Sequence, residues 1–202
     1  MITWVEIVSA VLGLGCVFLA GRNSKRNFWV GYAYNAFLFV LFLRQHLYCV
    51  MLLQLVSFGI NLFGHFRWTH PRENERSASD EARLKVSTLN AQQWSFFMLV
   101  TCIFGVMLAS GMDWLSQKWP DVFLPDPSPW LDAFILAFTL MAQYLSAQKC
   151  WECWLIWIGI NIANIALYLV AGLYVMPVVS ALYLVNAVWS LITWRKLYRN
   201  NE

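Results

Sequence analysis

The chain has 202 residues, of which 60% are hydrophobic and only 12% are charged, and its formal net charge is +3. A soluble domain of average composition carries about twice that charged fraction, so an ordinary soluble protein is excluded. The apolar residues form long runs, which is typical of a protein that crosses a membrane several times. We therefore expect membrane lipid around the chain and no nucleic-acid partner.

The first apolar segment is predicted to be a retained span, because no basic region precedes it and no cleavage site follows it. We predict an all-α membrane protein with seven transmembrane helices. Each is long enough, in some cases with interfacial residues, to cross about 30 Å of hydrocarbon. In chain order the predicted spans are 2–20, 28–45, 48–68, 93–112, 130–147, 154–173 and 175–194.

Basic residues are concentrated in alternate connections between these spans. The loops at 21–27 and 67–92, Lys149 and the segment after residue 194 hold 12 of the 14 lysines and arginines. Only Arg44 and Lys118 fall on the other side. Basic loops stay in the cytosol, so the N-terminus is predicted to lie outside and the C-terminus in the cytosol.

The sequence resembles itself when it is shifted by 126 residues without a gap, with nine identities over 65 aligned positions. The markers in register are Trp4 with Trp130, Asn35 with Asn161, Leu47-Tyr48 with Leu173-Tyr174, and Trp68 with Trp194. We predict two parallel three-helix repeats joined by one connector helix, a 3+1+3 arrangement. The expected divisions are 1–68 for the first repeat, 69–128 for a cytosolic loop, the connector helix and an outer loop, and 129–202 for the second repeat and tail. Small transporters built from repeats hold their substrate between them, near the middle of the membrane.

Polar side chains inside these spans are candidates for a binding site, because an amide in hydrocarbon is costly unless it faces protein or water. Trp154, Trp157 and Asn161 are spaced to share one helix face. The further candidates are Asn35, Gln54, Ser57, Asn61, Gln143 and Tyr183. The competing interpretation is that these groups only bond helix to helix across the bundle.

The candidate residues also limit the ligand. No lysine or arginine lies deep in a span, and His46, His65 and His70 lie at or near span ends, so no anion site, metal site or cofactor is expected. Indole faces favour a planar, preferably cationic ring, and amides favour hydroxyls or a carboxamide. The pattern therefore predicts a small hydroxylated aromatic substrate, such as a nucleoside-like vitamin.

The remaining features are interpreted as structural. Trp151 and the tryptophans at span ends, Trp4, Trp68, Trp130 and Trp194, are predicted to form interfacial belts. Cys150 and Cys153 form a C-x-x-C pair without partners for a metal site and are predicted to be unreactive thiols. Loop 69–92 is predicted to be a connection, with a short helix capped by Ser79, and 113–129 an outer lid.

The sequence W-L-I-W-I-G-I-N at 154–161, together with L-L-Q at 52–54 and G-I-N-L-F-G at 59–64, resembles the PnuC family of bacterial vitamin transporters. The resemblance implies a fold similar to the SWEET sugar carriers and facilitated diffusion of nicotinamide riboside across the bacterial inner membrane. It implies uptake drawn by a cytosolic nicotinamide riboside kinase. The substrate residues that it implies are Trp154, Trp157, Asn161, Gln54, Asn61 and Asn35.

Several alternatives stay open at this stage. Related branches of the family carry thiamine or riboflavin, and a receptor that binds without transport is a further possibility. A membrane enzyme is disfavoured, because Glu6, Asp113, Asp132 and Glu152 all lie near span ends without a histidine close by. The oligomeric state is left open, with a homo-oligomer as one option.

Overall fold

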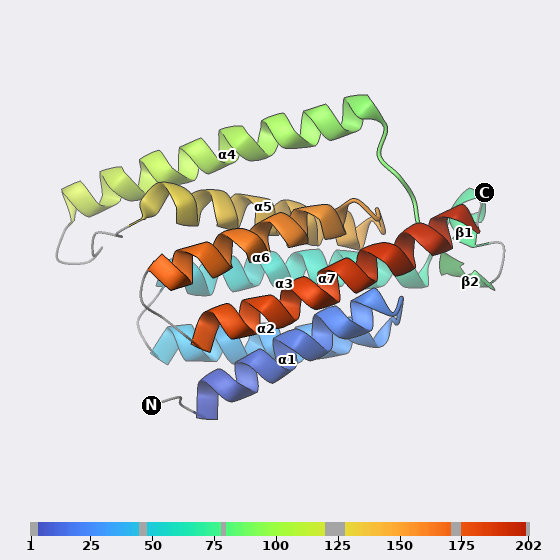
Figure 1. Ribbon diagram of the computed structural model, residues 1–202, viewed down its shortest axis with the longest axis horizontal. Helices are drawn as coiled ribbons and strands as arrows, with labels where there is room; N and C mark the ends of the chain where they lie inside the picture. The colour runs from blue at the N-terminus through green and yellow to red at the C-terminus, as the bar shows by residue number, and fades with distance from the viewer. Residues whose placement is uncertain (1–3, 45–47, 78–79, 120–127, 171–174, 201–202) are drawn as a thin grey trace.

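The computed structural model describes residues 4–44, 48–77, 80–119, 128–170 and 175–200 (Figure 1). Within these ranges the fold is all-α, with seven long helices and one small hairpin, which confirms the predicted fold class. The helices are α1 (Trp4–Gly21), α2 (Arg26–Arg44), α3 (Tyr48–Thr69), α4 (Ala91–Lys118), α5 (Pro129–Ala147), α6 (Cys153–Val170) and α7 (Val175–Arg199). A single 3-10 turn, η1 (Glu73–Glu75), and strands β1 (Arg76–Ser77) and β2 (Asp80–Leu84) follow α3.

The helices run side by side, and the two termini lie at opposite ends of the bundle (Figure 1). The β1–β2 hairpin, the α1–α2 and α5–α6 turns and the C-terminus share one end, which we call the hairpin end. Helix α4 packs on α5 at the edge of the molecule, and the other six helices form the body (Figure 1). This placement is compatible with the predicted role of α4 as a connector between two three-helix groups.

Hydropathy identifies the described helices that are long and apolar enough to cross a membrane. Among the described residues, three helical stretches are long and apolar enough to cross a membrane: Ala91–Lys118, Pro129–Ala147 and Met176–Arg199. Two shorter apolar stretches are Ile7–Gly21 and Cys153–Leu169. Helix α2 is less apolar because it buries Asn27 and Asn35 inside the protein, where they need not meet lipid.

Two buried tryptophans tie the three-helix groups together crosswise at the hairpin end. The indole N–H of Trp68 in α3 donates to the carbonyls of Ser146 (3.3 Å) and Ala147 (3.2 Å) at the end of α5. The indole N–H of Trp194 in α7 donates to the carbonyls of Ala20 and Gly21 at the end of α1, both at 3.2 Å. All three matched positions differ by 126 residues, so the contacts follow the register of the sequence repeat.

Further contacts follow the same register. The rings of Phe28 and Trp68 pack in a T-shaped arrangement at 5.1 Å between centroids, and the rings of Trp154 and Trp194 do the same at 5.4 Å. Asn23 and Lys149, which are equivalent positions, both adopt positive φ, at 57° and 62°. The two groups are therefore built alike in their turns as well as in their helices, which supports the internal repeat.

The prediction that Trp68 and Trp194 belong to an interfacial belt is wrong. Their side chains are 1% and 0% exposed, and their N–H groups donate to carbonyls at the C-termini of α5 and α1, where a helix runs out of its own donors. Trp4 and Trp130, at 71% and 49% exposed, keep the outward position that a belt requires.

The segment after α3 is a hairpin that docks onto the body and is more than a connection. The backbone of Ser87 forms two hydrogen bonds with the α5–α6 turn. The Ser87 N–H donates to the Lys149 carbonyl, and the Ser87 carbonyl accepts from the Trp151 N–H. The Lys149 side chain is buried, donates to the Leu84 carbonyl and lies 4.7 Å from the Trp68 ring centroid. Ser79, the expected helix cap, lies outside the described residues.

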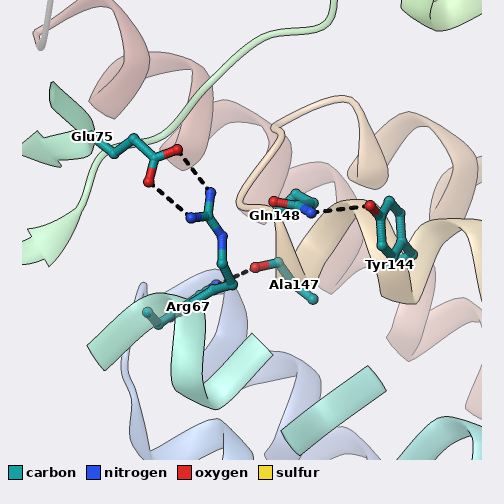
Figure 2. Close-up of polar contacts among 6 residues, drawn as sticks. Arg67, Glu75, Tyr144, Ala147 and Gln148 are labelled. Carbon is teal, nitrogen blue, oxygen red and sulfur yellow. Dashed lines mark hydrogen bonds and ion pairs between the residues drawn. The ribbon is translucent and has the colours of Figure 1, made fainter. Parts of the chain in front are cut away.

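Two carboxylates fix this docked segment. Glu152, which is buried, accepts from the Thr88 hydroxyl at 2.5 Å and from the Leu89 N–H at 2.8 Å. Glu75 forms a bidentate ion pair with Arg67 of α3, at 2.8 and 3.0 Å (Figure 2). Hydrogen bonding to this guanidinium holds the pKa of Glu75 below its ordinary value, so the pair persists into mildly acidic solution.

The thiols of the C-x-x-C pair are enclosed by the same docking. Cys150 and Cys153 are free and buried, and the Cys150 sulfur lies 3.4 Å from the Ser87 hydroxyl. Burial raises the pKa of the Cys150 thiol to about 11, so it stays protonated at neutral pH. This is the environment of an unreactive thiol.

Replacing Trp194 by phenylalanine should destabilise the protein, because a smaller ring remains and the carbonyls at the end of α1 lose the indole donor. We expect a loss of about 1 kcal/mol from each indole donor, whether the change is Trp194→Phe or the equivalent Trp68→Phe. Thermal unfolding in detergent measures the effect against Trp4→Phe as control. Equal stability of all three variants would contradict the assignment.

Replacing Glu152 by alanine should release the docked segment. Charge-assisted bonds of this kind contribute about 2 kcal/mol, so the opened population should rise more than about tenfold. Limited trypsin digestion, followed at the bond after Lys85, reports this opening. Glu73→Ala, a change of the same charge at an exposed position of the same segment, is the control and should digest like the unmodified protein.

Candidate functional site

A cavity of about 710 Å³ lies between the two three-helix groups. Its described lining comes from α1, α2, α3, α5, α6 and α7, and α4 contributes none of it. The volume is in the range of sites that enclose small organic ligands. The connector thus stands apart from the cavity, and both repeats share it.

Helix α6 presents one continuous face to this cavity. Trp154, Trp157 and Asn161, predicted to share a face, all line it, and Asn164 and Tyr168 continue the same face. These positions recur every three or four residues, which is the spacing of one side of an α-helix. The expected grouping of two indoles and an amide is therefore present in the structure.

The two indoles are not equally available. Trp154 is 2% exposed and packs against Trp194 in a T-shaped arrangement, with the ring planes 85° apart. Trp157, one turn further from the hairpin end, is only half-buried. Trp157 therefore offers the larger free ring surface, and Trp154 forms the floor beneath it.

The amides have defined free groups. The Asn161 amide Nδ2 donates to the Trp157 carbonyl at 2.8 Å within α6, which leaves its oxygen and its second N–H available to a ligand. Asn35, the equivalent position in α2, is 5% exposed and lines the same cavity. Its Nδ2 has no hydrogen-bond partner among the described residues, and a buried unpaired donor is costly unless a ligand or water satisfies it.

The remaining predicted residues are divided. Ser57, Asn61, Gln143 and Tyr183 all line the cavity. Gln54, one turn from Ser57 on α3, is half-buried and is absent from the described lining. Gln54 therefore lies outside the cavity in this structure.

A tyrosine pair narrows the cavity on the α1 side. A Cβ added at Gly13 would collide with the Tyr183 hydroxyl and would lie 3.5 Å from the Tyr34 ring. Glycine at this position lets the hydroxyl of Tyr183 approach the backbone of α1. The polar ends of two phenols therefore meet α1 at the cavity wall.

Ser180 and Asn186, which the helical spacing groups with Tyr183, also line the cavity. The structure adds polar residues that the prediction of the site did not include, among them Tyr34, Thr139, Asn164 and Tyr168. Asn164 and Tyr168 could have been found by extending the helical spacing beyond Asn161. Tyr34 carried no such signal, because it directly precedes Asn35 and only the packing against α1 and α7 turns it inward.

The cavity carries no formal charge in its described lining, which is made of aromatic, amide, hydroxyl and aliphatic side chains. Nor do the described residues contain a group of three or more histidines, cysteines, aspartates or glutamates that could hold a metal ion. A neutral aromatic and amide lining suits an uncharged or singly cationic ring with hydroxyl groups, because it offers no partner to a phosphate.

Comparison with known proteins points to the same class of protein. The profile of the nicotinamide mononucleotide transporter family matches residues 3–196. The nicotinamide riboside transporter PnuC of Escherichia coli (strain K12) is 25% identical over 195 residues, covering 87% of this chain and 78% of that protein. The riboflavin/roseoflavin transporter RibM of Streptomyces davaonensis is 24% identical over 193 residues, covering 96% of this chain and 85% of that protein.

The fold agrees with a solved structure as well. The crystal structure of the vitamin B3 transporter PnuC superposes with a TM-score of 0.73 at 25% identity, covering 98% of this chain and 83% of that one. The family match spans nearly the whole chain and includes both three-helix groups. The chain is therefore a multi-pass membrane protein of the nicotinamide mononucleotide transporter family, a PnuC-type vitamin transporter and not an enzyme.

Proposed function

We propose that this protein carries nicotinamide riboside across the bacterial inner membrane by facilitated diffusion. The observation that carries the proposal is the pairing of Trp157 with two equivalent amides, Asn35 and Asn161, around one uncharged cavity. A cationic pyridinium ring suits an indole face, and the ribose and carboxamide supply the polar groups that amides recognise. The names of the relatives support the same substrate class.

The free groups of the two amides suggest how the ligand lies. Asn161 has its oxygen available, so it would accept a hydrogen bond from the carboxamide N–H or a ribose hydroxyl. Asn35 has a free Nδ2, so it would donate to a carbonyl or hydroxyl oxygen of the ligand. The ring would stack on Trp157 above the floor formed by Trp154. Asn61, Ser57, Gln143 and Tyr183 would complete the polar wall.

The uncharged cavity also bears on the driving force. The described lining contains no aspartate, glutamate or histidine, so it offers no side chain of the kind that carries a coupled proton. We propose that a cytosolic kinase draws uptake inward by phosphorylating the nicotinamide riboside that has entered. The uncharged cavity offers no partner for the resulting phosphate, so the phosphorylated form would not return. The hairpin end, where most basic residues lie, would face the cytosol. Rocking of one three-helix group against the other would expose the cavity to each side in turn.

Riboflavin is the second candidate substrate. RibM of Streptomyces davaonensis matches nearly all of this chain, at an identity similar to that of the nicotinamide riboside transporters. The isoalloxazine ring of riboflavin is larger than nicotinamide but is also planar and suits an indole face. The two vitamins differ in ring area and in the carboxamide, so binding measurements separate them.

Titration calorimetry of the purified protein in detergent should show binding of nicotinamide riboside at micromolar or lower dissociation constant, with riboflavin and thiamine much weaker. Tight binding of riboflavin or thiamine instead would keep the cavity and change the substrate. If a folded protein binds none of the three, the proposed site is wrong.

Removing the free indole face should weaken binding selectively. We expect Trp157→Ala to lose about 1–2 kcal/mol of ring contact, which is a roughly tenfold rise in Kd. Asn161→Ala should lose a similar amount through its hydrogen bond. Trp157→Phe, which keeps a smaller ring, should lie between Trp157→Ala and the unmodified protein. Unchanged affinity in both alanine variants, measured by calorimetry on folded protein, would refute this binding mode.

A further inference from the structure

We propose that the gate at the hairpin end is asymmetric: it opens between α1 and α7, while the docked segment keeps α3 and α5 together. This inference rests on the alternating access proposed above. It assigns different roles to two contacts that the repeat makes equivalent, the α1–α7 seam and the α3–α5 seam.

The two seams close the cavity with matched contacts. In the α1–α7 seam, Phe18 stacks on Trp189 at 5.7 Å between ring centroids, and in the α3–α5 seam Phe63 stacks on Tyr144 at 6.1 Å. All four positions correspond under the shift of 126 residues. Each seam also contains one of the indole-to-carbonyl contacts of Trp194 and Trp68.

Small residues let both seams close. A Cβ added at Gly21 would collide with the Ser190 hydroxyl, and one added at Gly64 would lie 2.9 Å from the Ala147 Cβ. These glycines occupy opposite helices of the matched pairs, α1 in one seam and α3 in the other. The backbones therefore approach closely at both seams, and opening the cavity to this end requires one of them to separate.

Only the α3–α5 seam is bridged by the docked segment 73–90 in the part of the chain that the structure describes. Arg67 anchors the segment to α3 through Glu75 (Figure 2). Further along, the segment bonds to the turn after α5 through Leu84 with Lys149, and through Thr88 and Leu89 with Glu152. A continuous run of bonds therefore joins the end of α3 to the end of α5.

The turn after α1 has the same internal bonds as the turn after α5: Asn23 and Ser24 donate to the carbonyls of Ala20 and Leu19, and Lys149 and Cys150 donate to those of Ser146 and Leu145. The two repeats differ at the position of Glu152, which binds the docked segment. Arg26 is the equivalent of Glu152, is exposed, and cannot accept the hydrogen bonds that Glu152 accepts.

The α1–α7 seam also contains a buried hydroxyl without a hydrogen-bond partner among the described residues. The Ser190 hydroxyl is 0% exposed and has no hydrogen-bond partner among the described residues, whereas the equivalent Gly64 has no side chain to satisfy. An unsatisfied buried hydroxyl destabilises the closed seam, and separation of α1 from α7 would let water reach it. Both observations make the α1–α7 seam the easier one to open.

Matched double-cysteine variants test the proposal in a background in which the native cysteines are replaced. The first pair is Phe18→Cys with Trp189→Cys, and the second is Phe63→Cys with Tyr144→Cys. None of these four residues lines the cavity. A short reducible bis-thiol reagent would join each pair in proteoliposomes, and uptake of nicotinamide riboside would be measured before and after reduction.

Linking the α1–α7 pair should lower uptake by about tenfold or more, because it holds one of two exchanging states, and reduction should restore it. Linking the α3–α5 pair should change uptake less than about twofold. Equal loss in both variants, or loss only in the α3–α5 variant, would overturn the proposal.

A second readout needs no substrate and so separates this inference from the proposed function. Spin labels on the same pairs report their separation through dipolar broadening. We expect two separations for the α1–α7 pair and one for the α3–α5 pair. Adding Glu75→Ala should give the α3–α5 pair a second separation, and Glu73→Ala should not. If both pairs show the same behaviour, the gate is symmetric and the inference fails, whatever vitamin is carried.

Discussion

The architecture depends on how helix ends are satisfied within a membrane protein. The last carbonyls of a helix have no partner within it, and in a bundle at membrane depth water cannot always serve them. Here the indoles of Trp68 and Trp194 supply the donors, each reaching across to the first helix of the other repeat. The same bonds that complete α1 and α5 therefore hold the two repeats together, and they do so at one end of the cavity.

The cavity inherits its character from this crosswise arrangement. Because each repeat supplies an amide at the same position, Asn35 and Asn161 face one volume from two sides, and Trp157 adds a ring surface on α6 only. A neutral lining with fixed donors and acceptors favours a hydroxylated ring over a phosphorylated one, since a phosphate would be desolvated without a cationic partner. The neutral lining therefore supports the proposed transport of an unphosphorylated vitamin.

The docked segment breaks the symmetry of this body without changing its repeats. It joins α3 to the turn after α5 by an ion pair, a buried lysine and the buried carboxylate of Glu152, whereas the exposed Arg26 takes the position of Glu152 in the first repeat. A connection of this kind stabilises one interface more than its twin. Two interfaces with similar geometry can then differ in how readily they open. The proposed asymmetric gate depends on such a difference between the α1–α7 and α3–α5 seams.

The sequence by itself determined the features that depend on local spacing: the helices, the register of the repeat, and the shared face of Trp154, Trp157 and Asn161. Only the tertiary structure decided what those residues meet. A tryptophan at the end of a span has the same local pattern whether its N–H meets interfacial water or a carbonyl more than 70 residues away. The sequence pattern therefore cannot show that Trp68 and Trp194 are buried. By its local sequence Lys149 is an exposed charge of a cytosolic loop, but the docked segment buries it. Tyr34 lines the cavity because of the helices that pack around it. Periodicity fixes which way a side chain points on its own helix, while partners distant in the chain are set by packing alone.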